Sequence, residues 1–375
     1  MDLTWLAVAG ACIWFGILLL PWRPWVTGEF VDADPDLSAQ DLGDITVLIP
    51  ARDEAEVIET TMSGLKAQRS DLRIILVDDR STDGTARIAR GLIKTNLLIV
   101  SGEPRPPGWS GKLWALEQGI KHVDTELLLL LDADIELSPG ILPALRKKML
   151  KNNLQFVSLM AALRMEGLWE RLLMPAFIYF FRLLYPFRLS NSTFPWVAAA
   201  AGGCILLKTD VLREMGGFKS VRGELIDDCA LARRAKSSGH RTWIGLSHSV
   251  RSLRPYDRLK TIWDMVARTA FNQLRYSILL LVLCTALMIV GFWVPIAGLL
   301  FPGPATKIVS AGALCVMMLL YLPTLKFYGL SWAWAFFLPM IGTLYLAMTW
   351  TSAIRFWQGK GPVWKGRAYR PGQNR

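Results

Sequence analysis

Long uncharged stretches lie at both ends of the chain. Residues 3–22 carry no charged side chain, and only Lys307 and Lys326 interrupt the region 277–354. Because a helix needs about 20 apolar residues to cross a bilayer core, these stretches predict membrane helices. We expect an N-terminal transmembrane anchor over residues 1–24, since no basic segment precedes the apolar stretch and no cleavage site follows it. The C-terminal membrane segments are expected near 277–301, 308–325 and 333–354.

The region between these ends, residues 41–276, has the pattern of a folded domain. Short β-type runs occur at 45–49, 74–77 and 127–131, and helical patterns follow the first two. Alternation of strands and helices predicts an α/β fold built on a mostly parallel sheet. In such sheets ligands bind at the carboxyl ends of the strands, so the residues that follow each strand are the candidates for chemistry.

Acidic side chains follow all three predicted strands. They are Asp53 and Glu54 after the first strand, Asp78, Asp79 and Asp83 after the second, and Asp132 and Asp134 after the third. A turn and helix cap explain residues 81–84, but they leave the like charges of Asp78 and Asp79 unexplained. In an extended segment the two carboxylates of an Asp-x-Asp pattern point the same way. Oxygen ligands of this kind suit Mg²⁺, which is commonly held by one or two carboxylates and substrate phosphates.

Two further segments downstream are candidates for the site. Residues 198–203 are small and end in Gly202-Gly203, which permits either close approach of a ligand or tight packing. Asp227 and Asp228 precede a helical pattern. Acids there can cap the helix, and a carboxylate that faces a hydroxyl acceptor can also act as a general base.

Residues 168–189 combine Leu, Phe and Tyr with arginines at 171, 182 and 188. This pattern predicts an amphipathic helix in the membrane interface, with arginines available for lipid phosphates; an ordinary buried helix is the alternative. A full crossing here is not expected, because it would separate Asp134 from Asp228.

Composition narrows the class of protein. Of 375 residues 52% are hydrophobic and 19% charged, which excludes a wholly soluble or disordered chain. The net charge of +11 suits nucleic acid, an anionic membrane or a phosphorylated substrate. Nucleic acid explains neither the apolar ends nor the acidic strand ends, so it is not an expected partner. The five cysteines form no disulfide-like framework, which favours a reducing compartment for the polar part.

Several segments in order resemble family 2 glycosyltransferases with the GT-A fold. They are IPARDEAEVI, VDDRSTDGT, GKLWALEQGI, LLLDADIELSP, AAAGGCILLKTDVLREMGGF and IDDCALARRAKSSGH. The stretch SLMAALRMEGLWERLLMPAFIYFFRLLYPF, with IDDCALAR, SLRPY and ARTAFNQLRY, is most similar to the hopene-associated glycosyltransferases of bacterial hopanoid biosynthesis. The resemblance implies a nucleotide-diphospho-sugar transferase fold over residues 41–276.

The resemblance also implies roles for residues around the donor. Pro50, Arg52 and Glu54 match the first nucleotide-contacting segment, Asp79 matches the acid that contacts the nucleoside, and Lys112 matches a basic position near the donor. A UDP-sugar is the expected donor.

Metal binding and catalysis are implied in the same way. Asp132 and Asp134 match the metal motif, with Asp134 holding Mg²⁺ or Mn²⁺ against the donor diphosphate. Asp228, beside Asp227, matches the catalytic base, although the family more often has Glu-Asp there. Removal of the acceptor proton by Asp228 during attack from the opposite face would invert the anomeric carbon. Gly202, Gly203 and Asp227 are expected in the acceptor and diphosphate region.

One motif departs from the family pattern. Membrane-bound members often carry Gln-x-x-Arg-Trp, whereas this chain has Gln273, Arg275 and Tyr276 in the sequence Asn-Gln-Leu-Arg-Tyr. These three residues are still expected near the diphosphate and acceptor, but processive polymer synthesis is not inferred.

The expected activity is inverting, metal-dependent transfer to a membrane lipid, with a hopanoid or its precursor as the expected acceptor. The alternatives are polyprenyl phosphate, ceramide or diacylglycerol as acceptor, or a catalytically silent membrane scaffold. The expected location is the bacterial inner membrane, multi-pass, with the catalytic domain cytosolic.

Topology is left open by two conflicting expectations. Four crossings with a cytosolic domain place the tail outside, yet residues 355–375 are basic and contain no acid, which favours the inside. Either one C-terminal segment is re-entrant or the N-terminal segment does not cross.

Overall fold

The computed structural model describes residues 4–68, 72–360, 363–364 and 367–368. The chain divides into two compact units. The sheet unit comprises Gly28–Arg164, Phe187–Pro255 and Trp364–Arg375, and the helical unit comprises Met1–Thr27, Met165–Pro186 and Tyr256–Val363. Residues 165–186 and 256–276, expected within the catalytic domain, therefore cluster with the apolar helices. Most of the predicted basic tail, 355–375, lies outside the described residues.

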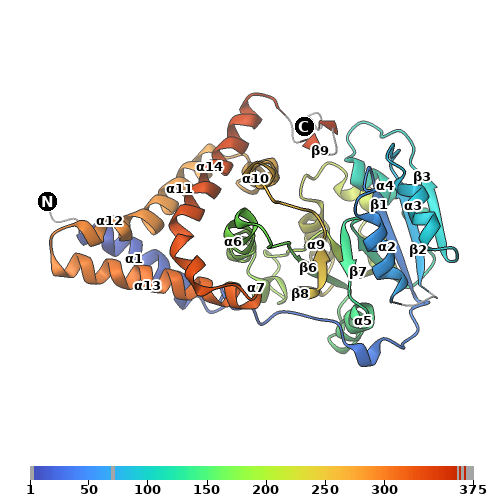
Figure 1. The fold of residues 1–375 in the computed structure, drawn as a ribbon, viewed down its shortest axis with the longest axis horizontal. Helices are drawn as coiled ribbons and strands as arrows, with labels where there is room; N and C mark the ends of the chain where they lie inside the picture. The colour runs from blue at the N-terminus through green and yellow to red at the C-terminus, as the bar shows by residue number, and fades with distance from the viewer. Residues whose placement is uncertain (1–3, 69–71, 361–362, 365–366, 369–375) are drawn as a thin grey trace. The chain divides into compact units, whose positions relative to one another are not determined.

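An eight-stranded sheet forms the centre of the sheet unit, with the order β3-β2-β1-β4-β7-β6-β8-β5 (Figure 1). Its strands are β1 Ile45–Ala51, β2 Arg73–Asp78, β3 Leu97–Ser101, β4 Leu127–Leu131, β5 Ile135–Leu137, β6 Phe156–Ala162, β7 Cys204–Lys208 and β8 Thr242–Ser252. Strands β3, β2, β1 and β4 pair in parallel, while β7 is antiparallel to both β4 and β6. The carboxyl ends of β1, β2 and β4 consequently meet at one edge, as the sequence predicts.

Helices cover both faces of this sheet, which explains its apolar strands. All five leucines of β4 are buried. Leu127, Leu129 and Leu131 belong to a core that also contains residues of three helices, α2 Ile58–Lys66, α3 Thr85–Leu92 and α5 Ile141–Lys151. Leu128 and Leu130 join a second core with α4 Gly111–Gly119, α8 Thr209–Glu214 and α9 Asp227–Ser237. Strands that are covered on both faces have uninterrupted hydrophobic sequences.

Among the described residues, the helical unit contains three helices that are long and apolar enough to cross a membrane, as predicted. They are Ile278–Leu300, Pro304–Phe327 and Trp332–Trp357. The first comprises α11 Ile278–Met288, a π-helical turn at Ile289–Trp293 and α12 Val294–Leu300; the second is α13, and the third contains α14 Leu338–Trp357.

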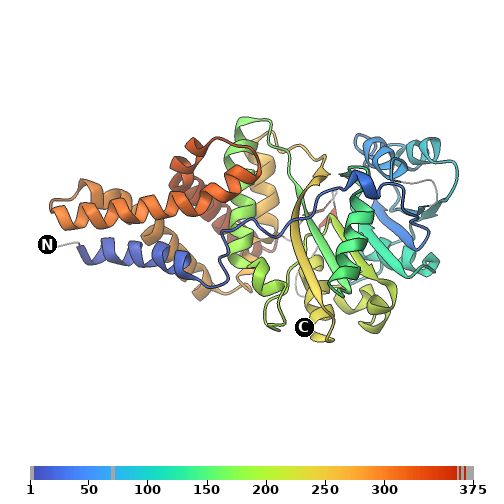
Figure 2. The same cartoon turned by 90° about the horizontal axis from the view of Figure 1, so that it is seen from below.

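The N-terminal helix α1, Thr4–Leu19, is shorter than the predicted anchor. Its 16 described residues span about 24 Å at 1.5 Å per residue, less than the roughly 30 Å hydrocarbon core. It ends at Leu19 because Pro21 follows, and a proline disfavours helical geometry in the residue before it. α1 lies along α13 in both views (Figure 1, Figure 2). At the start of the two helices, the Thr4 and Thr306 hydroxyl oxygens are 2.7 Å apart.

A tryptophan from α1 stabilises the π-helical turn. Pro295 has no N–H, so the carbonyl of Gly291 loses its α-helical donor. The indole Nε1–H of Trp14 donates to this carbonyl at 2.7 Å, and Trp14 is buried. A side chain from a neighbouring helix thus satisfies a backbone group that proline leaves open in an apolar environment.

The helix predicted near 168–189 is α6, Leu168–Leu184, and much of it is buried in the helical unit. Tyr345 donates its hydroxyl hydrogen to the carbonyl of Leu173 at 2.8 Å. Arg182 is only 2% exposed, so the expectation that it is available at the surface for lipid phosphates is wrong for this residue. Helix α6 packs against α13 and α14. The unit is completed by α10, Leu259–Gln273.

Candidate active site

The first group of predicted site residues lies at the ends of β1 and β2. Arg52 donates to the carbonyl of Asp79 at 2.6 Å, and the Asp79 side chain is buried. Asp53 accepts from the backbone N–H of Thr82 at 2.8 Å, while Asp83 accepts from that of Ala55 at 2.8 Å. These bonds tie the two strand ends to each other.

The turn and cap alternative is therefore correct for part of this group. Asp78 accepts from the backbone N–H of Ser81 at 3.0 Å. Asp83 accepts from both the backbone N–H and the hydroxyl of Thr85, the first residue of α3. Such bonds satisfy helix and turn N–H groups that otherwise lack partners. They also hold the pKa of Asp83 below its usual range, although burial alone would raise it.

Asp132 and Asp134 follow β4 in a turn, not in the extended segment assumed from the sequence. The N–H of Ile135 donates to the carbonyl of Asp132 at 3.2 Å, which closes the turn. The two carboxylates meet different cations: Asp132 pairs with Lys112 at 2.7 Å and Asp134 with Arg254 at 2.7 Å. The expectation of an extended segment is wrong because the chain turns between β4 and β5.

Lys112 joins the strand end of β4 to the start of α9. It lies in the first turn of α4, which Ser110 caps by accepting from the N–H of Leu113. Its ammonium donates to Asp132 and to the carbonyl of Gly202, the latter at 3.3 Å. Burial alone would lower the pKa of Lys112, but the surrounding carboxylates of Asp132, Asp227 and Asp228 raise it above its usual range. Lys112 is therefore a permanent cation of the site.

Asp228 lies in the first turn of α9 with a carboxylate suited to proton transfer near neutral pH. Burial and the neighbouring Asp227 raise the pKa of Asp228 to about 7, while Lys112 and backbone N–H groups oppose the shift. One of these is the N–H of Cys229, which donates to Asp228 at 2.7 Å. An acid whose pKa matches the working pH is an effective general base.

Gly202 lies where a side chain would come close to both Lys112 and Asp228. A Cβ atom at this position would lie 3.1 Å from the Lys112 ammonium and 3.3 Å from a carboxylate oxygen of Asp228. At Gly203 it would lie 3.0 Å from a methyl of Ile135. Both glycines are thus places of close approach, and Gly202 leaves room directly between the cation and the acid.

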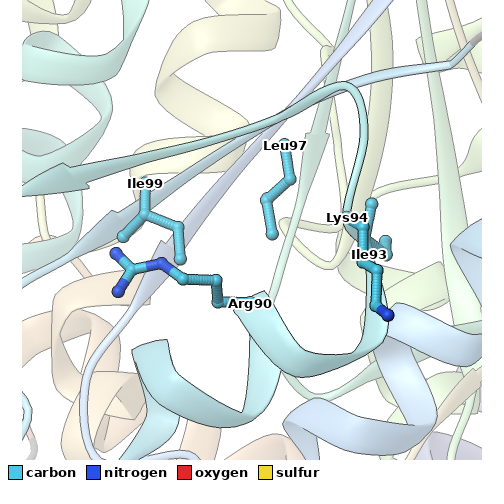
Figure 3. A pocket seen from close by; sticks show the side chains of 5 residues that line it. All are labelled: Arg90, Ile93, Lys94, Leu97 and Ile99. Atoms are coloured by element: carbon cyan, nitrogen blue, oxygen red, sulfur yellow. The ribbon is translucent and has the colours of Figure 1, made fainter.

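A narrow cleft brings many of these residues together. Its lining comprises Pro50, Lys112, Leu116, Leu130, Leu131, Asp132, Gly202, Ile205, Asp227, Asp228 and Leu231. A larger surface hollow of about 440 Å³ lies beside β3 and is lined by Arg90, Ile93, Lys94, Leu97 and Ile99 (Figure 3). None of the predicted site residues lines that hollow, so the cleft holds the candidate chemistry.

The residues at the end of β4 fit a divalent metal only together with further ligands. Asp132 and Asp134 supply oxygen donors, which Mg²⁺ and Mn²⁺ accept. Among the described residues no group of three or more His, Cys, Asp or Glu side chains is placed to hold a metal ion. Phosphate and water would have to complete the coordination. The site fits a metal that binds with a diphosphate.

Arg254 is the site residue without an assigned role in the sequence analysis. It donates to Asp134 and also to Glu54, the latter at 3.2 Å, although both acids come from distant parts of the sequence. The only signal was its place in Ser-Leu-Arg-Pro-Tyr, shortly after the end of β8. Without the strand order of β5 and β8, this position cannot be connected to Asp134.

Gln273, Arg275 and Tyr276 belong to the helical unit. Gln273 ends α10 and accepts from the Tyr185 hydroxyl at 2.5 Å. Tyr276 stacks on Phe356 with ring centroids 4.4 Å apart. Arg275 and Tyr276 both have positive φ, at 52° and 55°, and so form a tight turn between α10 and α11.

Part of the chain is similar in sequence to known glycosyltransferases. Residues 46–216 match the model of glycosyl transferase family 2. Over 91 residues the chain is 34% identical to 4,4'-diaponeurosporenoate glycosyltransferase of Staphylococcus aureus, a match that covers 24% of this chain and 24% of that protein. The chain thus spans about a quarter of the length of the curated relatives that it matches.

Among solved structures, the chain is similar to the mannosyltransferase PcManGT from Pyrobaculum calidifontis in complex with GDP-Man and Mn²⁺. The TM-score is 0.54 at 19% identity, over 94% of this chain and 98% of that one. At this identity the likeness shows the fold, and it confirms the predicted GT-A-like sheet with C-terminal apolar helices.

Proposed function

We propose that this protein is a membrane-bound, inverting glycosyltransferase that moves a sugar from a nucleoside-diphosphate donor to a lipid hydroxyl. The observation that carries the proposal is the pairing of an acid and a cation in one cleft. Asp228 has a pKa of about 7, and the permanently charged Lys112 lies between it and Asp132. Such a site can accept a proton and stabilise a departing diphosphate within the same small volume.

Asp228 is the proposed base. In its carboxylate form it takes the proton of the acceptor hydroxyl as the oxygen bonds to the anomeric carbon of the sugar. The bond from that carbon to the diphosphate breaks in the same displacement, which inverts the carbon. Gly202 leaves space beside Asp228, and Gly203 and Asp227 are proposed to shape the acceptor side.

The donor is proposed to bind across the ends of β1, β2 and β4. Pro50, Arg52, Glu54 and Asp79 contact the nucleoside, and Lys112 faces the diphosphate. Asp132 and Asp134 would hold Mg²⁺ or Mn²⁺, which supplies positive charge against the leaving diphosphate when bound. PcManGT is described with GDP-Man and Mn²⁺. For this chain we favour a UDP-sugar.

A lipid acceptor is favoured by two observations. The helical unit has three helices suited to crossing a membrane, and the S. aureus relative is named for a carotenoid acid, a lipid-like acceptor. We propose a hopanoid or its precursor, in the bacterial inner membrane with the sheet unit in the cytosol. Gln273, Arg275 and Tyr276 remain proposed contacts of the diphosphate and acceptor.

Purified protein in detergent tests the enzyme proposal. It should transfer sugar from UDP- or GDP-sugars only when Mg²⁺ or Mn²⁺ is present, and chelation should abolish transfer. If no nucleotide sugar binds in the presence of metal, the protein is a silent scaffold and the proposal fails.

Mass spectrometry of lipids from cells with and without the protein identifies the acceptor. A glycosylated hopanoid that disappears with the protein supports the favoured acceptor. If the glycosylated lipid that disappears is instead a polyprenyl phosphate, a ceramide or a diacylglycerol, that lipid replaces the hopanoid as the proposed acceptor.

A reporter fused after Arg375 tests the side of the tail. A cytosolic signal is expected, because Arg355 and the residues after it are rich in basic side chains. A periplasmic signal contradicts this.

A further inference from the structure

One arginine holds two acids of the donor site. The Nε of Arg254 is 2.7 Å from Asp134, and its Nη2 is 3.2 Å from Glu54. The side chains of both acids are almost buried, at 13% and 12% exposed, while that of Arg254 is 35% exposed. A guanidinium has a fixed fork of donors and can bridge two carboxylates in this way.

Strand pairing places Arg254 at this position. Ser252 at the end of β8 pairs with Ile135 of β5, and the N–H of Leu253 donates to the carbonyl of Asp134 at 2.8 Å. Pro255 follows and restricts the backbone of Arg254. The arginine backbone is therefore fixed beside Asp134, and only its side chain is able to change partner.

This ion pair conflicts with metal binding by the same carboxylate. A metal ion on Asp134 would lie close to the guanidinium, and two cations on one carboxylate repel each other. Mg²⁺ needs ligand oxygens at about 2.0–2.1 Å and loses its water reluctantly, so a carboxylate already held by an arginine is a poor ligand for it. A diphosphate changes the balance, because it brings negative charge for both cations.

We propose that Arg254 is the resident counter-cation of the metal site: it holds Asp134 and Glu54 until the donor arrives, and then releases Asp134 and pairs with the donor diphosphate. This inference rests on the proposed function. Metal and nucleotide then bind cooperatively, because each favours the state in which Arg254 has left Asp134. Arg254 acts as a positioning residue, and because of it the metal binds tightly only when the donor is bound.

Mn²⁺ binding measured by electron paramagnetic resonance tests this without an activity assay. The full chain in detergent is titrated with Mn²⁺ alone and with UDP or GDP present. The wild-type protein should bind Mn²⁺ weakly alone and roughly 5- to 150-fold more tightly with nucleotide, the usual range of coupling between sites. Arg254→Gln should bind Mn²⁺ alone more tightly than the wild type and lose most of the coupling.

Two further variants control the comparison. Arg251→Gln makes the same change on β8, where Arg251 pairs with Glu136 at 3.0 Å and is largely exposed, and it should match the wild type. Arg254→Lys keeps the charge without the fork and should retain part of the coupling; it also serves if the glutamine variant does not fold.

The outcomes separate the two proposals. If the wild type shows nucleotide-dependent Mn²⁺ binding and both Arg254 variants bind Mn²⁺ as it does, the counter-cation role is wrong and the proposed function stands. If the wild type binds no Mn²⁺ with either nucleotide, the proposed function fails and this inference fails with it.

Discussion

Two groups of acids at the edge of the sheet differ in what neutralises them. At the ends of β1 and β2, Asp53, Asp78 and Asp83 accept hydrogen bonds from backbone N–H groups. At the end of β4, Asp132 and Asp134 pair with the side chains of Lys112 and Arg254. The first group maintains the shape of the loops. In the second group the partners are themselves charged side chains.

This difference has a physical origin. A backbone N–H is fixed by the fold, so a carboxylate bonded to it stays in place and stabilises a turn. A lysine or arginine side chain can rotate toward a phosphate and leave its acid for a metal. Acids of similar appearance in the sequence therefore have different tasks, and substitutions should separate them.

The largest effect is expected at Asp228. Asp228→Asn removes the proton acceptor and should lower kcat by about 10² to 10⁴ while nucleotide affinity changes little. Turnover with a UDP- or GDP-sugar and equilibrium binding of the nucleotide measure the two quantities. Asp210→Asn is the matched control, because Asp210 also lies in the first turn of a helix but pairs with the exposed Arg213. Full transfer by Asp228→Asn would show that another group is the base.

Lys112→Gln should have the next largest effect, about 10²-fold on kcat, because it removes a charge directed at the leaving group. Asp132 then also loses its 2.7 Å partner. The measurement is single-turnover transfer at saturating donor. Lys121→Gln, on the same part of the chain but outside the cleft lining, should behave as the wild type. Equal losses in the two variants would mean that Lys112 has only a structural role.

A smaller effect is expected from pH. The pKa of Asp228 is raised to about 7, so below this pH the acid is protonated and cannot accept the acceptor proton. The rate should therefore fall about tenfold for each pH unit below 7 and level off above it. Lys112 lowers the pKa of Asp228, so Lys112→Gln should move the profile to higher pH. A profile without a step between pH 5 and 9 would contradict this assignment.

The smallest effect on catalysis is expected at Asp83. Asp83→Ala removes acceptors for the N–H groups of Ala55 and Thr85 and should lower the free energy of unfolding by about 1–2 kcal/mol. Thermal unfolding measures this loss, and transfer per folded molecule should stay within a few-fold of the wild type. A loss of activity as large as that of Asp228→Asn would remove the distinction between the two groups of acids.

The sequence contained enough to predict the sheet and the acids at its edge. The buried leucines of β4 and the acids after it follow from local pattern alone. The turn at Asp132–Asp134 could not be predicted, because it depends on β5 leaving to pair with β8. Arg254 was missed for the same reason. Its partners Asp134 and Glu54 are brought to it only by strand order.

The contact between Trp14 and Gly291 has a consequence for biosynthesis. The two residues are 277 positions apart, so the ribosome makes the indole donor long before the carbonyl that accepts from it. At about 5–20 residues per second, roughly 14 to 55 s separate their synthesis. During this interval the Trp14 indole cannot yet donate to the Gly291 carbonyl. The helical unit can therefore reach its final packing only after the C-terminal helices have been made.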